Sequence, residues 1–252
     1  MTREERVMLD AFRGVSDVIE VPGAVVLLVP EAPGSPMLNR VVGLGSSGPA
    51  TEEQVDAALS VVPSGTRFYV AVAPDAEPPE LAPWLSARGL EPGWGWMAFR
   101  RGVEAAPAVE TVLGLVDVES HEQRAAFARI VRQGYDLPEE VERRLAGTPD
   151  AAGWDCLLAV DGGEPAGAAA LFVADGVGYL GFAATLPAHR GKGAQSALLA
   201  ERIRRAATAR CDLVITETGE RRDDLPSNSY RNILRAGFEE VGVTANWVGT
   251  AA

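Results

Sequence analysis

The stretch TLPAHRGKGAQSALLAERI, residues 185–203, joins a proline and a basic glycine-rich turn to an apolar helical pattern. Gly191 and Gly193 lack a Cβ, so the backbone can turn tightly there and a ligand can approach it closely. The helix that follows begins with unpaired N–H groups and a partial positive charge. Because Arg190 and Lys192 add full charges, the turn indicates a phosphate or diphosphate site. An ordinary strand-to-helix turn with solvated cations is the alternative.

The helix after this turn is predicted from about Gly193 to Ala209, where apolar residues recur at helical spacing. Its apolar face consists of Leu199, Ile203 and Ala206. Three basic residues are expected to lie away from that face: Arg202, Arg204 and Arg205.

The elements around this helix alternate between strand and helix patterns. Before it, strands are predicted at 111–118, 154–160, 165–174 and 177–185, with helices at 121–134 and 137–147. After it come a strand at 211–218, a short helix at 229–237 and a last strand pair around 239–249. The chain is therefore expected to be α/β (α+β), with antiparallel hairpins leading into a strand-helix-strand unit.

The N-terminal half gives a weaker version of the same pattern. Residues 1–14 look helical, and residues 21–30, 39–45 and 67–74 look like strands. Residues 51–62 look like a helix whose Thr51 and Gln54 are spaced as a capping box. A helix and a strand are expected within 79–101. The proline-marked segment 100–110 is the candidate linker, which predicts domains at 1–105 and 106–252.

Two segments suggest an internal duplication. Leu85 and Gly89 of the first segment match Ile233 and Gly237 of the second, and each segment ends in a strand that carries a tryptophan. Chance similarity between two helix ends is the alternative.

Composition narrows the classes of partner. The formal net charge of −12 argues against a broad nucleic-acid-binding face and mildly favours cationic partners such as amines. An acidic surface kept for solubility is the simpler explanation of the same charge. The chain has two cysteines and two histidines, which give no disulfide framework, zinc pair or other metal cluster. No signal peptide or membrane span is evident, so a reducing cytoplasm is expected.

The whole stretch FAATLPAHRGKGAQSALL resembles the acetyl-coenzyme A motif [QR]-x-x-G-x-[GA] of the GCN5-related N-acetyltransferases. Arg190 takes the first motif position and Gly193 the second, whereas Gln195 stands where Gly or Ala is usual. The resemblance covers about residues 111–248. It implies a mixed, mostly antiparallel sheet flanked by helices, with the N-terminal lobe a smaller, degenerate copy of the same fold.

The resemblance also implies a cofactor, acetyl-CoA, and the residues that bind it. Backbone groups of Ala183 and Thr185, with Ala184 between them, are expected to pair with the pantetheine amides. Backbone N–H groups at the turn are expected to hold the diphosphate: Gly191, Lys192, Gly193, Ala194, Gln195 and Ser196. Arg190 adds charge, Lys192 either binds the 3′-phosphate or points to water, and Asn228 is a further candidate in a loop of doubtful register.

Candidate catalytic residues follow from the same resemblance. The family's usual tyrosine acid position holds Ile233, so Tyr230, one turn earlier, is the nearest substitute; a packing tyrosine is the alternative. Glu217, at the end of its strand, is the candidate base, with a strand-end carboxylate or a water chain as alternatives. His189 and Cys211 are expected to pack.

The implied reaction is direct attack of an amine, on a small molecule or a peptide, on the acetyl thioester in a ternary complex. A non-catalytic acyl-CoA sensor or scaffold, or an enzyme with another acyl group or acceptor, is the alternative. A homodimer is left open, and no nucleic-acid or membrane partner is expected.

Overall fold

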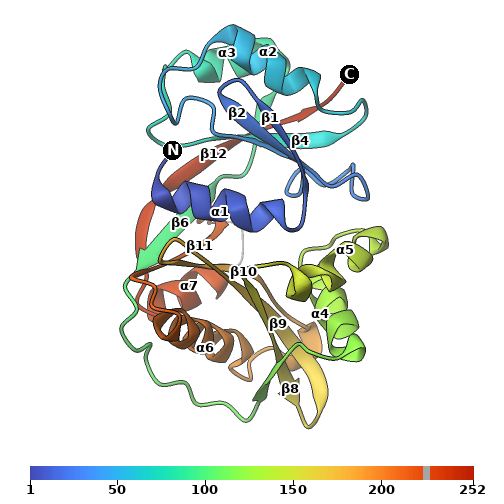
Figure 1. Ribbon diagram of the computed structural model, residues 1–252, viewed down its shortest axis with the longest axis vertical. Coiled ribbons are helices and arrows are strands. Elements are labelled where there is room, and N and C mark those ends of the chain that lie inside the picture. The colour runs from blue at the N-terminus through green and yellow to red at the C-terminus, as the bar shows by residue number, and fades with distance from the viewer. Residues whose placement is uncertain (224–227) are drawn as a thin grey trace.

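The computed structural model describes residues 1–223 and 228–252. Within these residues, twelve strands form one sheet that runs through two lobes (Figure 1). The order is β1-β2-β3-β4-β12-β6-β11-β10-β9-β8-β7, and β5 pairs with β12. The β3–β4 and β10–β11 pairs are parallel and the other described pairs are antiparallel. The predicted mixed, mostly antiparallel sheet flanked by helices is therefore confirmed.

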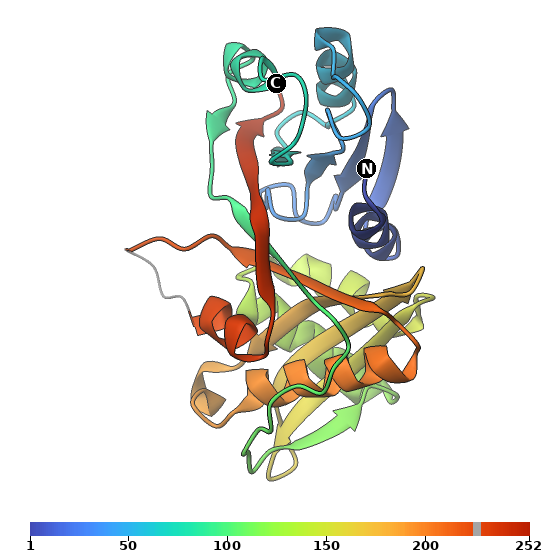
Figure 2. The same ribbon diagram turned by 90° about the vertical axis from the view of Figure 1, so that its left-hand side faces the viewer.

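The C-terminal lobe follows the predicted element order closely. Its strands are β7 (Gly114–Asp117), β8 (Trp154–Asp161), β9 (Glu164–Ala174), β10 (Val177–Thr185), β11 (Leu213–Gly219) and β12 (Glu239–Thr250). Its helices are α4 (His121–Gly134), α5 (Glu142–Ala146), α6 (Ala194–Thr208) and α7 (Asn228–Arg235), with short 3₁₀ turns at Glu139–Val141, Thr148–Asp150 and Pro187–His189. Helices α4 and α6 both pack on β8, β9 and β10, so the sheet is covered on both faces (Figure 2).

The N-terminal lobe is smaller. Its elements are β1 (Asp17–Val21), β2 (Ala24–Leu28), β3 (Arg40–Val42), α2 (Glu52–Ser60), β4 (Arg67–Val72), α3 (Leu81–Ala87) and β5 (Glu91–Pro92). Strand β1 lay outside the sequence prediction, while the capping box of Thr51 and Gln54 is present. Val26, Val55, Val70 and Leu85 belong to a core that is separate from those of the other lobe.

Helix α1 (Arg3–Arg13) begins the chain but packs against the C-terminal lobe. Its Val7 and Ala11 belong to the same core as Phe127 of α4. The indole Nε1 of Trp154 in β8 donates to the Ala11 carbonyl at 3.2 Å. The lobes are therefore joined through α1 as well as through the sheet.

Two strands are exchanged between the lobes. Strand β6 (Trp96–Arg101) precedes the linker, yet it lies between β11 and β12 of the C-terminal lobe. Strand β12 pairs with β6 over Glu239–Thr244 and with β4 and β5 over Ala245–Thr250. The last segment is thus one long strand with a bulge near Val241, where a strand pair was expected. In each lobe, the strand contributed by the other lobe fills the gap between two of its own strands (Figure 2).

The two segments that suggested a duplication also end their helices in the same way. Gly89 after α3 and Gly237 after α7 have φ of 80° and 85°. The next residue closes each end, since Leu90 N–H donates to the Leu85 carbonyl and Phe238 N–H to the Ile233 carbonyl.

No helix in the described parts of the chain combines the length and the hydropathy needed to cross a bilayer.

Candidate active site

Helix α6 begins at a left-handed glycine. Gly193 is its N-cap residue, with φ 84° and ψ 4°, and no side chain caps the helix. A Cβ at Gly193 would lie 3.1 Å from the Glu110 carbonyl oxygen and 3.2 Å from Thr111 Cβ. Any other residue would therefore be strained by its φ and crowded by the linker, which explains the glycine.

The open start of α6 presents backbone donors. The N–H groups of Ala194, Gln195 and Ser196 have no intrahelical acceptor, because they belong to the first turn. Thr111 Oγ1 donates to the Lys192 carbonyl oxygen at 2.7 Å and so holds the preceding turn against the linker. We call the backbone N–H groups of residues 191–196 the α6 anion site, since together with the helix dipole they favour a negative group.

The basic residues of the turn differ in their surroundings. Arg190 is exposed. Lys192 Nζ lies 2.5 Å from Asp161 Oδ2, and His189 Nδ1 lies 2.8 Å from the same oxygen. These bonds, that of Lys192 first, hold the pKa of the Asp161 carboxyl below its ordinary value. Lys192 is therefore paired with the β8–β9 hairpin, and His189 joins the same carboxylate in place of simple packing.

Gln195, which departs from the resembled motif, connects α6 to α7. Its Nε2 donates to Ser229 Oγ at 3.0 Å, and its Oε1 accepts from Asn232 Nδ2 at 2.7 Å. Its side chain thus points to α7, and only its backbone N–H belongs to the α6 anion site. Asn228 opens α7, where its Oδ1 accepts from Arg231 at 2.5 Å.

Strand β10 bulges immediately before the turn. Its pairing with β9 shifts register between Gly181 and Ala184, and Phe182 takes a left-handed φ of 49°. Its pairing with β11 ends at Leu180, opposite Thr216. Beyond Leu180 the two parallel strands separate, which leaves the β11-facing edge of β10 without a strand partner.

Ala183, Ala184 and Thr185, which are predicted to pair with the pantetheine amides, lie on this bulged segment. Ala184 pairs with Ala168 and Thr185 with Gly167 of β9, so their strand is held on one side only. The backbone of Ala183 lies near the Tyr135 hydroxyl at the end of α4, and it lowers the pKa of this phenol against the larger opposite effect of burial. Ala183 is therefore the residue of this segment nearest to the α4 side of the sheet.

Arg202 is buried beneath the bulge, contrary to the expectation that it lies outside the apolar face of α6. It is 1% exposed. Its Nη1 donates to the carbonyls of Ala170 and Gly181 at 3.1 and 3.2 Å, and its Nε donates to Leu198. Burial lowers its pKa to about 10. Position 202 follows Leu199 by three residues, so helical spacing places it on the buried face and could have revealed it.

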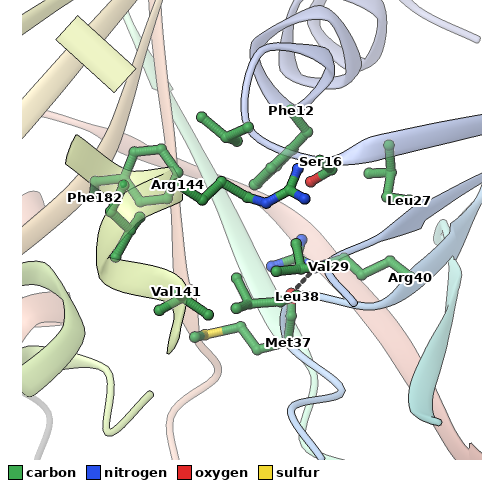
Figure 3. Close-up of a pocket in the computed structure, with 12 residues that line it drawn as sticks. Phe12, Ser16, Leu27, Val29, Met37, Leu38, Arg40, Val141, Arg144 and Phe182 are labelled. Carbon is green, nitrogen blue, oxygen red and sulfur yellow. Dashed lines mark hydrogen bonds between the residues drawn. The ribbon is translucent and has the colours of Figure 1, made fainter. Parts of the chain in front are cut away.

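A pocket opens on the α4 side of the same bulge, between the lobes. We call it the interlobe pocket. Its lining comes from α1, β3, β6, α4, β10 and β11 and from the loops before β3 and after α4. The lining residues are Phe12, Met37, Leu38, Arg40, Trp96, Val131, Tyr135, Leu137, Tyr179, Leu180, Gly181, Phe182 and Glu217. A second, more apolar pocket adjoins it and shares Phe12, Met37, Leu38, Arg40 and Phe182 (Figure 3). We call this one the side pocket.

Arg40 of the N-terminal lobe and Glu217 of the C-terminal lobe form an ion pair in the interlobe pocket. Nη1 of Arg40 lies 3.3 Å from Glu217 Oε1, and the two side chains are 9% and 14% exposed. The guanidinium carbon lies over two aromatic rings, 5.0 Å from the centre of Phe12 and 4.9 Å from that of Trp96. Glu217 thus faces the separation of β10 and β11, as expected, but it already has a cationic partner.

Tyr230 does not line either pocket. It is 4% exposed, packs edge-on against Phe99 and donates its hydroxyl to Glu240 at 2.6 Å. Burial and the Glu240 carboxylate raise its pKa to about 12. The tyrosines of the interlobe pocket are Tyr135 and Tyr179, and burial raises the pKa of both phenols.

Residues 117–227 match the model of the acetyltransferase (GNAT) family. These residues form a GNAT domain, of the GCN5-related N-acetyltransferase superfamily. This GNAT protein is therefore placed among the acyltransferases as a class. The matched region contains the bulge, the α6 anion site and Glu217, but not Arg40, which the N-terminal lobe supplies.

Solved GNAT structures share the fold of nearly the whole chain. A GCN5-related N-acetyltransferase from Kribbella flavida has a TM-score of 0.70 and 21% identity, covering 99% of this chain and 95% of its own. A GCN5-related N-acetyltransferase from Sphaerobacter thermophilus has a TM-score of 0.64 and 15% identity, and the match covers 91% of this chain and 81% of that one. A tandem GNAT protein from the clavulanic acid biosynthesis pathway has a TM-score of 0.61 and 16% identity, and the match covers 98% of this chain and 87% of that one. No curated protein matches this sequence.

The sequence analysis did not name Arg40 or Tyr135 as parts of this site, and it expected Arg202 on the wrong face of its helix. Arg202 had a spacing signal. Arg40 and Tyr135 had none, because Arg40 meets Glu217 across 177 positions of sequence and Tyr135 reaches Ala183 only through the packing of α4 on the sheet.

Proposed function

We propose that this GNAT protein is an acetyl-CoA-dependent N-acetyltransferase that acylates a small-molecule amine bound in the interlobe pocket. One observation carries the proposal. The bulged end of β10 leads directly into the α6 anion site, and the same bulge, through Gly181 and Phe182, lines the interlobe pocket. A diphosphate-bearing cofactor and an acceptor would therefore meet at the end of one strand.

The residues present suit coenzyme A. Uncapped N–H groups at the start of a 15-residue helix favour its diphosphate, and the unpaired edge of β10 offers amide partners for an extended pantetheine arm. When bound, acetyl-CoA supplies an activated acyl thioester. Arg190, exposed beside the turn, is the basic side chain best placed to add charge.

The chain's own groups would hold and move protons as follows. Glu217 faces the pocket and would bind the incoming ammonium and accept its proton. Tyr135 is a protonated phenol at neutral pH, and burial raises its pKa further; it would donate to the departing sulfur in place of Tyr230. Arg202 would fix the bulge through the Gly181 carbonyl and so acts as a positioning residue.

The equivalent arrangement of the two lobes supports an origin by duplication, with domains at 1–105 and 106–252 that have exchanged β6 and β12. Both lobes have a parallel strand pair joined by a helix, and both end a later helix at a left-handed glycine.

A non-catalytic acyl-CoA sensor is the second candidate. It is favoured by the engagement of Glu217 with Arg40 and of Tyr230 with Glu240, since both candidate proton carriers already have partners.

Release of free thiol from acetyl-CoA in the presence of a panel of amines tests the proposal. We expect amine-dependent thiol release and acylated product by mass spectrometry, and a slower rate in Tyr135→Phe by about 10²-fold or more. A chain that binds acetyl-CoA by calorimetry yet releases no thiol with any amine would instead be the sensor.

A further inference from the structure

Arg40 has one donor group, Nη2, for which the described residues offer no acceptor. Its Nε donates to the Met37 carbonyl at 2.6 Å, and Nη1 reaches Glu217 at 3.3 Å. Within residues 1–223 and 228–252, Nη2 meets no acceptor, although the side chain is nine-tenths buried and lines both pockets. A guanidinium presents its donors as a planar fork suited to a carboxylate. The unused edge of Arg40 is therefore an anion-binding group inside the pocket.

The contact between Arg40 and Glu217 is weaker than such a pair can be. Charge-assisted N–H···O bonds are usually about 2.7–2.9 Å long and often bidentate. Here a single contact of 3.3 Å joins the two groups, while the rings of Phe12 and Trp96 both contact the guanidinium. The rings would keep Arg40 in place if its partner changed.

The charged side chains that face the pockets are paired. Arg144, which enters the side pocket opposite Arg40 (Figure 3), is paired with Glu31 at 3.0 Å and with Asp17 at 3.1 Å. Arg40 and Glu217 balance each other. A ligand with net charge would leave one buried charge without a partner, which is costly, whereas a zwitterion can be inserted into the pair with every charge opposed.

The remaining lining is apolar on the far side of Arg40. The side pocket contains Val15, Leu27, Val29, Leu38 and Leu145. Arg40 therefore stands between a polar pocket that ends at Glu217 and the β10 bulge and a small, mostly apolar pocket.

We propose that the acceptor is a free α-amino acid with an apolar side chain: its ammonium binds Glu217, its carboxylate binds Arg40, and its side chain faces the apolar lining of the side pocket. This rests on the proposed function and names its substrate class. In the transfer, the N–C bond forms as the C–S bond breaks. The ammonium loses two protons, of which one ends on the thiol sulfur and one passes to solvent.

Matched ligands test the proposal by calorimetry on the full chain with saturating coenzyme A. The panel is leucine, valine and phenylalanine, each with its amide and with the amine that lacks the carboxylate. We expect the amino acid to bind about 30-fold more tightly than its amine or amide, because a charge-assisted contact is lost in both. Equal or tighter binding of the amines, or no binding of any amino acid, would overturn the proposal.

Variants locate the effect. In Arg40→Gln, the ratio of amino-acid to amine affinity should fall about 30-fold toward one, and Arg40→Lys, which keeps the charge without the fork, should lie between. Arg88→Gln is the matched control, because Arg88 pairs with Glu52 and Asp56 away from both pockets; its ratio should equal that of the wild type. Should Arg40→Gln fail to fold, the ligand series on the wild type and Arg40→Lys still decides.

Acyl transfer separates this proposal from the proposed function. Thiol release with amines but without preference for the carboxylate would overturn the amino-acid proposal alone. Carboxylate-selective binding that depends on Arg40, in a chain that never binds acetyl-CoA, would overturn the proposed function alone.

Discussion

Helices α2 and α6 occupy equivalent places in the two lobes, because each connects two neighbouring parallel strands. Helix α2 begins with Thr51 in a capping box with Gln54, and Glu52 and Glu53 occupy its first turn. Helix α6 begins with the uncapped, left-handed Gly193 and has no acidic residue in its first turn. The start of α2 is therefore capped by its own side chains and negatively charged, whereas the start of α6 is free to bind an anion.

The strands that precede these two helices also differ, in their length and in the presence of a bulge. Strand β3 has three residues, whereas β10 has nine and bulges at Phe182. A buried arginine, Arg202, ties α6 to that bulge, while the buried residues of α2 are Val55 and Ala58. The comparison shows that the topology alone does not make a diphosphate site; the cap, the first-turn charges and the bulge do.

An acidic side chain at the start of α6 should abolish the difference in anion binding between the starts of α2 and α6. In Ser196→Glu, repulsion of the diphosphate and loss of helix-dipole stabilisation should weaken acetyl-CoA binding by about 30-fold or more. Ala207→Glu adds the same charge at the other, exposed end of α6 and should bind as the wild type does. Equal affinities of the two variants by calorimetry would contradict the assignment of the site to the helix start.

Replacing Arg202 tests whether the bulge depends on it. Arg202→Met leaves the carbonyls of Ala170 and Gly181 without their donor and should lower the free energy of unfolding by about 2 kcal/mol. Arg204→Met, at a 64% exposed side chain, should cost far less. Urea unfolding of the two variants makes the comparison, and similar values would show that Arg202 has no special role.

The acid stability of α6 should depend on Glu201. Hydrogen bonds from Arg204 and then Arg205 lower its pKa from 4.5 to about 2. Because the folded-state pKa is depressed, the stabilisation is complete above about pH 4.5 and is lost as the pH falls toward 2. Glu201→Gln should therefore lower the free energy of unfolding by about 1–2 kcal/mol at pH 7, a value reduced for the exposure of Arg204. The difference from wild type should vanish near pH 2, and a constant difference between pH 7 and pH 2 would refute this origin.

Removing the side-chain cap of α2 should change stability less than the variants above. Thr51→Ala removes one hydrogen bond of the capping box and should cost about 1 kcal/mol of stability. Acetyl-CoA affinity should not change, since the N-terminal lobe is not expected to bind it. A change in affinity measured alongside thermal unfolding would link α2 to the cofactor and contradict the comparison.

The sequence predicted best what depends on neighbours along the chain. The basic glycine turn, the helix after it and the capping box of Thr51 each arise within a few residues, so local patterns were sufficient. The hairpins at Asp161 and Asp175 follow from their glycines in the same way.

Features that depend on tertiary pairing were not predicted. The exchange of β6 and β12 leaves no trace in periodicity, because a strand looks the same whichever lobe it joins. The pair of Arg40 and Glu217 is formed only when the lobes meet. A buried arginine such as Arg202 violates the usual polarity of a helix face, and its partners are carbonyls supplied by a bulge.

A calorimetric titration of the full chain with acetyl-CoA tests the central claim that one lobe alone carries an open anion site. The account predicts one site per chain, weakened in Ser196→Glu and unchanged in Ala207→Glu. Two sites per chain, or no binding by the folded wild-type protein, would contradict it.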